Sequence, residues 1–296
     1  KQSVNLALTA LNITAPAFIL AAVGFCWVKL GFEYRVEFVT RLAMTLSVPC
    51  LIFVVLMNAN LTPEALGALT LASFAAYALV TIGFFIVAKL MRLDISTYLA
   101  PLVFGNTGNL GLPLALFAFG EAGLSYAIVV FAVMAILSFT IGVWIVSGGG
   151  SLTRVVREPV VAATFLGALF LWRGWQTPAF LTNALDLIGQ MAIPMMLITL
   201  GVAIARLETR DIGRAVWLSA LKIVICAGSA WIAAQAFGLA PVPSAVLIMQ
   251  VATPVAVTSY LLAEKYGHEA QPVAGLVVAS TLLSVISLPL ILAFVI

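Results

Sequence analysis

The chain has 296 residues, of which 64% are hydrophobic and 8% charged, and its formal net charge is +3 at pH 7. Soluble domains contain about 25% charged residues, so this composition excludes an ordinary soluble protein. The apolar residues form blocks of roughly 20, which is the length a helix needs to cross a membrane. These blocks lack the alternation of polar and apolar residues that is typical of membrane β-barrels. We therefore expect an all-α polytopic membrane protein.

Hydropathy and helix breakers predict ten transmembrane helices. In chain order they cover residues 3–28, 38–57, 64–88, 97–118, 122–147, 159–172, 178–205, 213–238, 242–264 and 272–295. A connector at 148–158 follows the fifth span, and it contains three consecutive glycines and two arginines. This basic, glycine-rich connector divides the chain into two halves of five helices each, at 1–147 and 159–296.

Lysine and arginine residues concentrate in the loops on one side of the predicted spans. That side holds Lys29, Arg35, Arg41, Lys89, Arg92, Arg154, Arg157, Arg206, Arg210, Arg214 and Lys265. The opposite side holds Lys1 and Arg173, and Lys222 falls inside a span. Positive residues are enriched in cytoplasmic loops, so both termini are predicted to be periplasmic. We expect the protein in a bacterial inner membrane.

The two halves are predicted to be inverted repeats, because an odd number of spans in the first half makes the second half enter from the opposite side. The second span has Pro49 near its middle, and the seventh has Pro194, at an offset of 145 residues. Gly120 ends the fourth span in the same way as Gly267 ends the ninth. The resemblance between the halves is weak as sequence but agrees with the predicted topology.

Two spans are predicted to be broken near their middles. The fourth contains Phe104-Gly105-Asn106-Thr107-Gly108-Asn109-Leu110-Gly111-Leu112-Pro113, and the ninth contains Gln250, Thr253 and Pro254, followed by Thr258 and Ser259. In a helix interior, glycine costs about 1 kcal/mol relative to alanine, and proline about 3 kcal/mol. Irregular backbone survives at membrane depth only where protein or a water-filled cavity surrounds it. Interruptions at corresponding positions of inverted halves indicate a substrate site at the midplane.

Such a site favours an anion. The N-termini of half-helices present unpaired N–H groups with roughly half an elementary positive charge, and amide and hydroxyl side chains can donate as well. We expect the substrate to contact residues among Asn106, Thr107, Gly108, Asn109, Gly111, Pro113, Gln250, Thr253, Pro254, Thr258 and Ser259. Single prolines and glycines usually only bend or pack membrane helices. The paired, polar and symmetric breaks favour a carboxylate site instead.

Four other polar residues inside spans are candidates for coupling or gating: Asn12, Asp186, Gln190 and Lys222. Intramembrane ionisable residues are functional candidates by default. Each has a structural alternative. Asp186 would be a solvated carboxylate near the interface, Lys222 would anchor its helix by extending to the interface, and the two amides would bridge helices.

No catalytic, metal-binding or nucleotide-binding motif occurs, so we expect neither an enzyme nor a cofactor. The expected partners are a small organic anion and the lipid bilayer, with no nucleic acid; a coupling Na⁺ or H⁺ and a homodimer stay open. One alternative is a sodium- or proton-coupled carrier of the same fold, including Na⁺/H⁺ exchange. Exchange requires buried carboxylates, and no Asp or Glu lies at 95–120 or 212–263. A membrane sensor or structural partner would not need two polar breaks.

The sequence resembles the auxin efflux carrier family, which includes plant PIN-type carriers and bacterial malonate or malate permeases. The similar segments are Asn-Thr-Gly-Asn-Leu-Gly-Leu-Pro at 106–113, Pro-Met-Met-Leu-Ile-Thr-Leu-Gly at 194–201 and Ala-Thr-Pro-Val-Ala-Val-Thr-Ser-Tyr at 252–260. The resemblance implies the fold of sodium/bile-acid symporters and sodium/proton antiporters, with helices 4 and 9 crossed. It also implies a scaffold of helices 1, 2, 6 and 7 and a transport domain of helices 3–5 and 8–10. Elevator-type alternating access would move the crossing between the two faces.

Overall fold

The computed structural model describes residues 2–59, 62–147, 159–207 and 212–295, and these ranges contain helices and no β-strand. The glycine-rich connector predicted at 148–158 lies outside the described residues. The first half contains α1 (Gln2–Lys29), α2 (Val36–Leu42), α3 (Val48–Met57), α4 (Pro63–Leu90), α5 (Ile95–Val103), α6 (Leu112–Leu137) and α7 (Val143–Ser147), with π-helical turns η1 (Ala43–Ser47), η2 (Thr107–Gly111) and η3 (Ser138–Gly142). The second half contains α9 (Pro159–Arg173), α10 (Ala179–Gln190), α11 (Ala192–Arg206), α12 (Ile212–Ala236), α13 (Pro241–Val251), α14 (Val257–Lys265) and α15 (Ala270–Val295).

Seven helical stretches among the described residues are long and apolar enough to cross a membrane. One of them, Thr107–Val146, covers 40 residues and includes parts of two predicted spans. Its path is interrupted at Gly120, where φ is 63° and ψ is −155°, a conformation that glycine adopts easily because it lacks a Cβ. The predicted spans at 159–172 and 242–264 contain shorter helices, namely α9, and α13 followed by α14.

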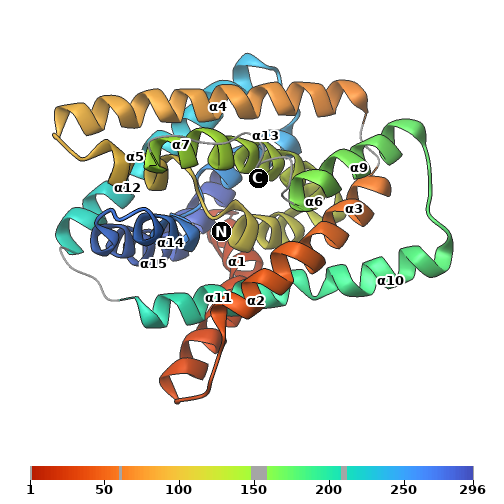
Figure 1. The fold of residues 1–296 in the computed structure, drawn as a ribbon. Coiled ribbons are helices and arrows are strands. Elements are labelled where there is room, and N and C mark those ends of the chain that lie inside the picture. Colours follow the sequence, from red (N-terminus) through yellow and green to blue (C-terminus); the bar gives the residue numbers. More distant parts are fainter. Residues whose placement is uncertain (1, 60–61, 148–158, 208–211, 296) are drawn as a thin grey trace.

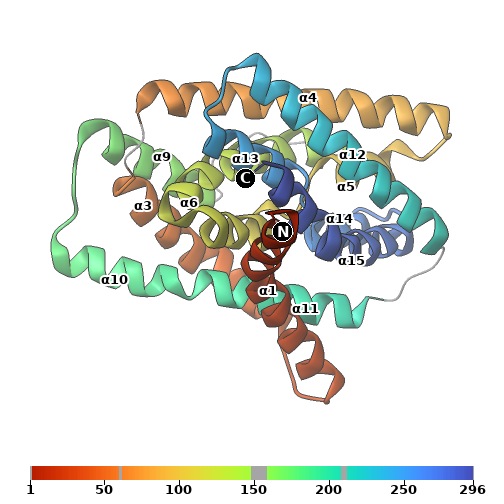
Figure 2. The ribbon, with the colours of Figure 1, turned by 180° about the vertical axis from the view of Figure 1, so that it is seen from behind.

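The helices are arranged in layers around the broken segments. Figures 1 and 2 show α4 along one side of the molecule and α10 with α11 along the opposite side, with α5, α6 and α13 between them. α1 crosses α11, and α3 packs against α9 and α10. α12 packs against α4, α13 and α15. The broken segments therefore lie inside the helical assembly.

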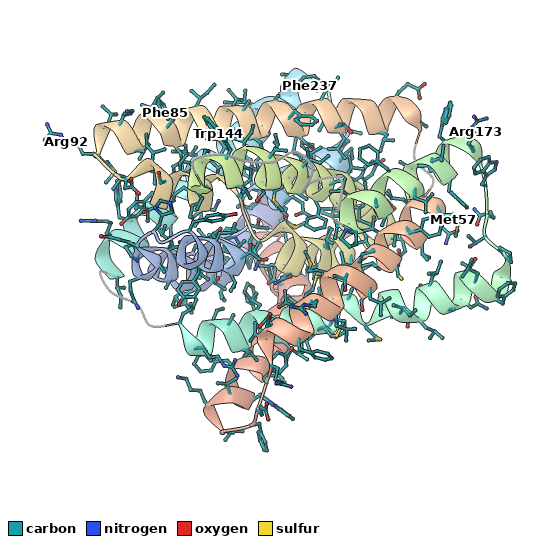
Figure 3. All side chains as sticks on the ribbon, viewed as in Figure 1. Met57, Phe85, Arg92, Trp144, Arg173 and Phe237 are labelled. Carbon is teal, nitrogen blue, oxygen red and sulfur yellow. The ribbon has the colours of Figure 1, made fainter. Side chains whose placement is uncertain are left out.

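Large apolar side chains cover the outside of the molecule. On α4, Phe74, Ile82 and Phe85 are exposed, whereas Tyr77 and Phe84 are buried. Figure 3 shows Phe85 and Phe237 along the upper edge of the molecule; both are exposed, and so is Trp144 of α7. A water-soluble surface would not carry this much exposed apolar area. Together with the seven apolar helical stretches, this surface identifies a multi-pass membrane protein.

The first broken helix begins at a side-chain cap. α5 starts after Asp94, whose carboxylate accepts the Thr97 N–H at 2.8 Å. Hydrogen bonds from Thr97 hold the pKa of Asp94 below its usual value. We expect Asp94→Ala to destabilise the protein by about 1 kcal/mol at pH 7, because the first turn of α5 loses its acceptor. Thermal melting of the purified protein measures this difference.

The stabilisation by Asp94 depends on pH. A carboxyl whose pKa is lower when folded stabilises the protein above its unfolded pKa, about 3.9, and loses this effect as the pH falls through the folded pKa. The melting difference between wild type and Asp94→Ala should therefore shrink at pH values below about 4. Asp94→Asn retains an acceptor oxygen and should lose less at pH 7. Equal melting temperatures of wild type and Asp94→Ala at pH 7 would contradict the cap.

Candidate functional site

The two broken helices cross at their interruptions. α5 ends at Val103 and α13 ends at Val251, and non-helical segments follow at 104–106 and 252–256. Gly105 and Val255 form an isolated antiparallel bridge, and the Asn106 N–H donates to the Pro254 carbonyl at 2.7 Å. These main-chain contacts join the halves of the chain. The first crossing point is therefore at 105–106, whereas Pro113 lies in the first turn of α6.

Small and capping residues allow the two backbones to meet. A Cβ at Gly105 would overlap the Thr253 hydroxyl and would lie 2.9 Å from the Thr253 carbonyl oxygen. The Thr253 hydroxyl donates to the Gln250 carbonyl at 2.7 Å, which satisfies an acceptor at the end of α13. The Val255 N–H donates to the Ser280 hydroxyl of α15 at 2.9 Å. The crossing thus requires glycine at 105 and uses polar partners from α13 and α15.

Several polar atoms at the crossing are buried and have no partner among the described residues. They are Nδ2 of Asn106, Oγ1 of Thr107 and both amide atoms of Gln250. Asn106 is 4% exposed, and Thr107 and Gln250 are 0% exposed. The Gln250 side chain lies against Gly111, where an added Cβ would overlap its oxygen. An unsatisfied buried polar group costs about 1–3 kcal/mol, so these groups are suited to binding a polar ligand.

The structure distributes the remaining predicted site residues around the crossing. Gly108 is buried against Phe131, and Pro113 is buried in α6. Asn109 and Ser259 are half-buried, and Thr258 is exposed at the start of α14. The buried residues Thr107, Gln250 and Thr253 therefore lie closer to the protein interior than the polar residues of α14.

Lys222 does not extend to the membrane interface, contrary to the structural alternative drawn from the sequence. It is 1% exposed, and its ammonium group donates to the Leu102 carbonyl at 2.8 Å. Leu102 lies in the last turn of α5, next to the crossing. The physical reason is that the break in α5 leaves the Leu102 carbonyl without its helical donor. The ammonium group donates to this nearby carbonyl instead of reaching water at the interface.

A cavity of about 960 Å³ lies between α1, α3, α6, α10 and α11. Its polar lining consists of Asn58, Glu121, Ser125, Tyr126, Thr182, Asn183, Asp186 and Gln190. Gln190 donates to Asp186 at 2.7 Å, so these two coupling candidates lie together, whereas Asn12 is exposed on α1. On α6 the lining begins at Leu116 and Phe117, beyond the crossing. The crossing residues themselves do not line this cavity.

Sequence reasoning missed Ser280, Asn58 and Glu121. Ser280 is one of several hydroxyl residues in the apolar helix α15, and its contact with Val255 depends on how α15 packs. Glu121 follows Gly120 and lines the cavity because the chain changes direction there. The glycine was the available signal for this change of direction.

A family model described as "Membrane transport protein" matches residues 10–292. This chain belongs to the auxin efflux carrier family. The family assignment agrees with the motifs at 106–113, 194–201 and 252–260. The description of the family model indicates that members of this family are membrane transport proteins.

Curated relatives of this auxin efflux carrier family member are also described as transporters. An uncharacterized transporter of Methanocaldococcus jannaschii is 23% identical over 197 residues, which cover 63% of this chain and 64% of that protein. A Rhizobium meliloti protein provisionally named a malonate transporter is 24% identical over 196 residues, 62% of this chain and 61% of that protein. An uncharacterized transporter of Methanothermobacter thermautotrophicus is 27% identical over 192 residues, with coverages of 62% and 63%. The chain thus matches less than two thirds of the length of each relative.

Proposed function

We propose that this protein is a secondary carrier of a small organic anion, which binds where the two broken helices cross. The observation that carries the proposal is the group of buried polar atoms without partners at the crossing, on Asn106, Thr107 and Gln250. The first turn of η2 adds main-chain N–H groups, which favour a carboxylate. Malonate is the first substrate to test, because one relative is named for it.

We also propose ten membrane crossings in two inverted halves. The seven long helical stretches give eight crossings if Thr107–Val146 turns back at Gly120. They give ten if α9 and the α13–α14 pair also cross once each. The crossing of α5 and α13 by an antiparallel bridge supports the inversion, because corresponding segments run in opposite directions. In Figure 3, Arg92 lies at the end of the molecule opposite Met57 and Arg173. The positive-inside rule then assigns the Arg92 end to the cytoplasm and both termini to the periplasm.

Helix packing supports a division into a scaffold and a transport domain. α1 packs along α11, and α3 packs against α9 and α10, which groups predicted helices 1, 2, 6 and 7. α12 packs against α4, α13 and α15, and α4 packs against α5 and α6, which groups the others. The cavity lies between these groups, on the side of Asn58 and Glu121. An elevator movement of the second group would carry the crossing towards the opposite face.

Reconstituted transport tests this proposal. Proteoliposomes preloaded with unlabelled malonate should accumulate radiolabelled malonate by counterflow, and an excess of external malate should compete if the site takes dicarboxylates. Empty liposomes provide the background. A thermal-shift screen with malonate, malate, aromatic carboxylates and bile acids, each with and without sodium, would identify ligands that stabilise the native state. Electrogenic Na⁺/H⁺ exchange without carboxylate binding would contradict the proposal.

A substitution at Gln250 can distinguish an effect on substrate binding from an effect on folding. We expect Gln250→Met to reduce counterflow by about tenfold or more, because the substrate loses a hydrogen-bonding partner worth about 1.5–3 kcal/mol when one group is charged. The melting temperature should stay equal or rise, because an apolar side chain of similar length replaces two unpartnered polar atoms. A lower melting temperature with unchanged transport would indicate that Gln250 has only a structural role.

The charges in the interior favour an anion over cation exchange. Among the residues whose burial is described, Lys222 is the one charged side chain in the buried class. Cation exchange requires a carboxylate that binds the ion within the membrane. Asp186 and Glu121 line the cavity between α1, α3, α6, α10 and α11, and they do not lie at the crossing.

A further inference from the structure

Lys222 lies in an unusual place for a charged residue. Its side chain is 1% exposed, and the two described partners of its ammonium group are both uncharged: the Leu102 carbonyl at 2.8 Å and the Cys226 sulfur at 3.8 Å. The ion pairs that the structure describes lie at the surface around α2. Burial of an ammonium group without a carboxylate is costly, so its position requires another source of compensation.

The break in α5 supplies that compensation. In a continuous helix, the Asn106 N–H would donate to the Leu102 carbonyl four residues earlier. Here the Asn106 N–H donates to Pro254 instead, which leaves the Leu102 carbonyl for another donor. The C-terminal end of a helix also carries a partial negative charge that favours a cation. The Lys222 ammonium therefore neutralises the carbonyl end of the first broken helix.

Carbonyl ends of broken helices have a known use in secondary transporters, where they coordinate the coupling Na⁺ while the opposing N-termini bind the anionic substrate. A lysine ammonium has the same charge as a sodium ion and donates hydrogen bonds to the same carbonyl acceptors. In this protein the carbonyl end is occupied by a cation that is covalently part of α12.

We propose that Lys222 is a built-in substitute for a coupling sodium ion, so that the carrier works without Na⁺. This inference rests on the proposed function, because it explains how charge is balanced at the crossing where the substrate is proposed to bind. Lys222 is thus a positioning residue, which acts on substrate binding by holding the end of α5. Removal of the side chain should open a site for a small cation beside the Leu102 carbonyl. The hydroxyl of Ser219, which is buried without a described partner three residues earlier on α12, is a second oxygen on the same helix face.

Ion-dependent melting tests this site without any substrate. The purified wild-type protein should melt at the same temperature in sodium chloride and in choline chloride of equal concentration. Lys222→Ala should melt lower in choline, and sodium should raise its melting temperature by roughly 2–4 °C when its concentration is about tenfold above the dissociation constant. Lys222→Gln should show no sodium effect, because its amide can still donate to the Leu102 carbonyl. Lys89→Ala, at an exposed lysine of α4, controls for loss of a positive charge.

Malonate counterflow provides the second readout. Wild-type transport should be equal in sodium and in choline. The counterflow rate of Lys222→Gln should be lower by about tenfold or more, because glutamine keeps a hydrogen-bond donor but not the positive charge. This variant also carries the test if Lys222→Ala does not fold. Sodium-specific stabilisation of the wild type, a folded Lys222→Ala that is indifferent to sodium, or full transport by Lys222→Gln would each overturn the inference. Absence of malonate transport by the wild type would instead count against the proposed substrate and leave the melting test intact.

Discussion

Gly105→Ala is expected to abolish transport and to destabilise the protein. The added Cβ would overlap the Thr253 hydroxyl and lie 2.9 Å from the Thr253 carbonyl oxygen, which real Cβ atoms do not tolerate. The two segments would have to separate, which strains or breaks the hydrogen bond from Asn106 to Pro254. Overpacking of this kind costs about 1–3 kcal/mol, and the melting temperature should fall by roughly 2–4 °C per kcal/mol. Counterflow and thermal melting measure the two effects.

Gly228→Ala is the matched control, because an added Cβ at this position of α12 meets nothing within 4 Å. Alanine is favoured over glycine in a helix interior by roughly 0.5–1 kcal/mol, so this variant should be at least as stable as the wild type. If Gly105→Ala and Gly228→Ala behaved alike, the close approach at the crossing would not be needed for transport.

Gly201→Ala is expected to be the most destabilising single-methyl change outside the crossing. The new Cβ would overlap the Ala21 carbonyl and lie 2.9 Å from the Phe25 nitrogen. Both neighbours are main-chain atoms of α1, so no side chain can move aside. Gly24 of α1 faces the Ile198 carbonyl of α11 in the same way. Small residues of this type let membrane helices approach closely, and the variant forces α1 and α11 apart.

A double-mutant cycle sharpens this prediction. Gly24→Ala and Gly201→Ala should each lower stability by about 1–3 kcal/mol or more, but the double variant should lose less than the sum. The reason is that separation of the helices by the first methyl group makes room for the second. Gly67→Ala on α4, where a Cβ meets nothing within 4 Å, is the control. Additive losses would mean that the two contacts are independent.

Much of this fold could be predicted because the membrane imposes length and polarity. Blocks of apolar residues predicted the membrane class, and the clustered glycines, asparagines and proline at 104–113 predicted a break in the fourth span. The break is present at 104–106. Its partner at Thr253 and Pro254 was also predicted, since proline cannot donate a main-chain hydrogen bond. The crossing itself is the contact between these two breaks.

Three features depended on tertiary packing and could not be predicted from local sequence. The crossing uses Gly105 and not Pro113, because the helix that begins at Thr107 continues through Pro113 by way of the π-helical turn η2. Lys222 turns inward because a carbonyl of α5 is free at that position. The cavity residues Asn58 and Asp186 come from α3–α4 and α10, which only the fold brings together. The use of these residues in transport stays a prediction.

The bridge between Gly105 and Val255 also has a consequence for biosynthesis, because its two residues are 150 positions apart. At about 5–20 residues per second, the ribosome needs roughly 8–30 s to add the second residue after the first. During that interval the polar break at 104–106 lacks its partner segment at 252–256. Translocon, water or lipid headgroups must accept the hydrogen bond of the Asn106 main-chain N–H until Pro254 is in place. Nascent chains of this protein should therefore depend on assisted insertion more than a protein built from continuous helices.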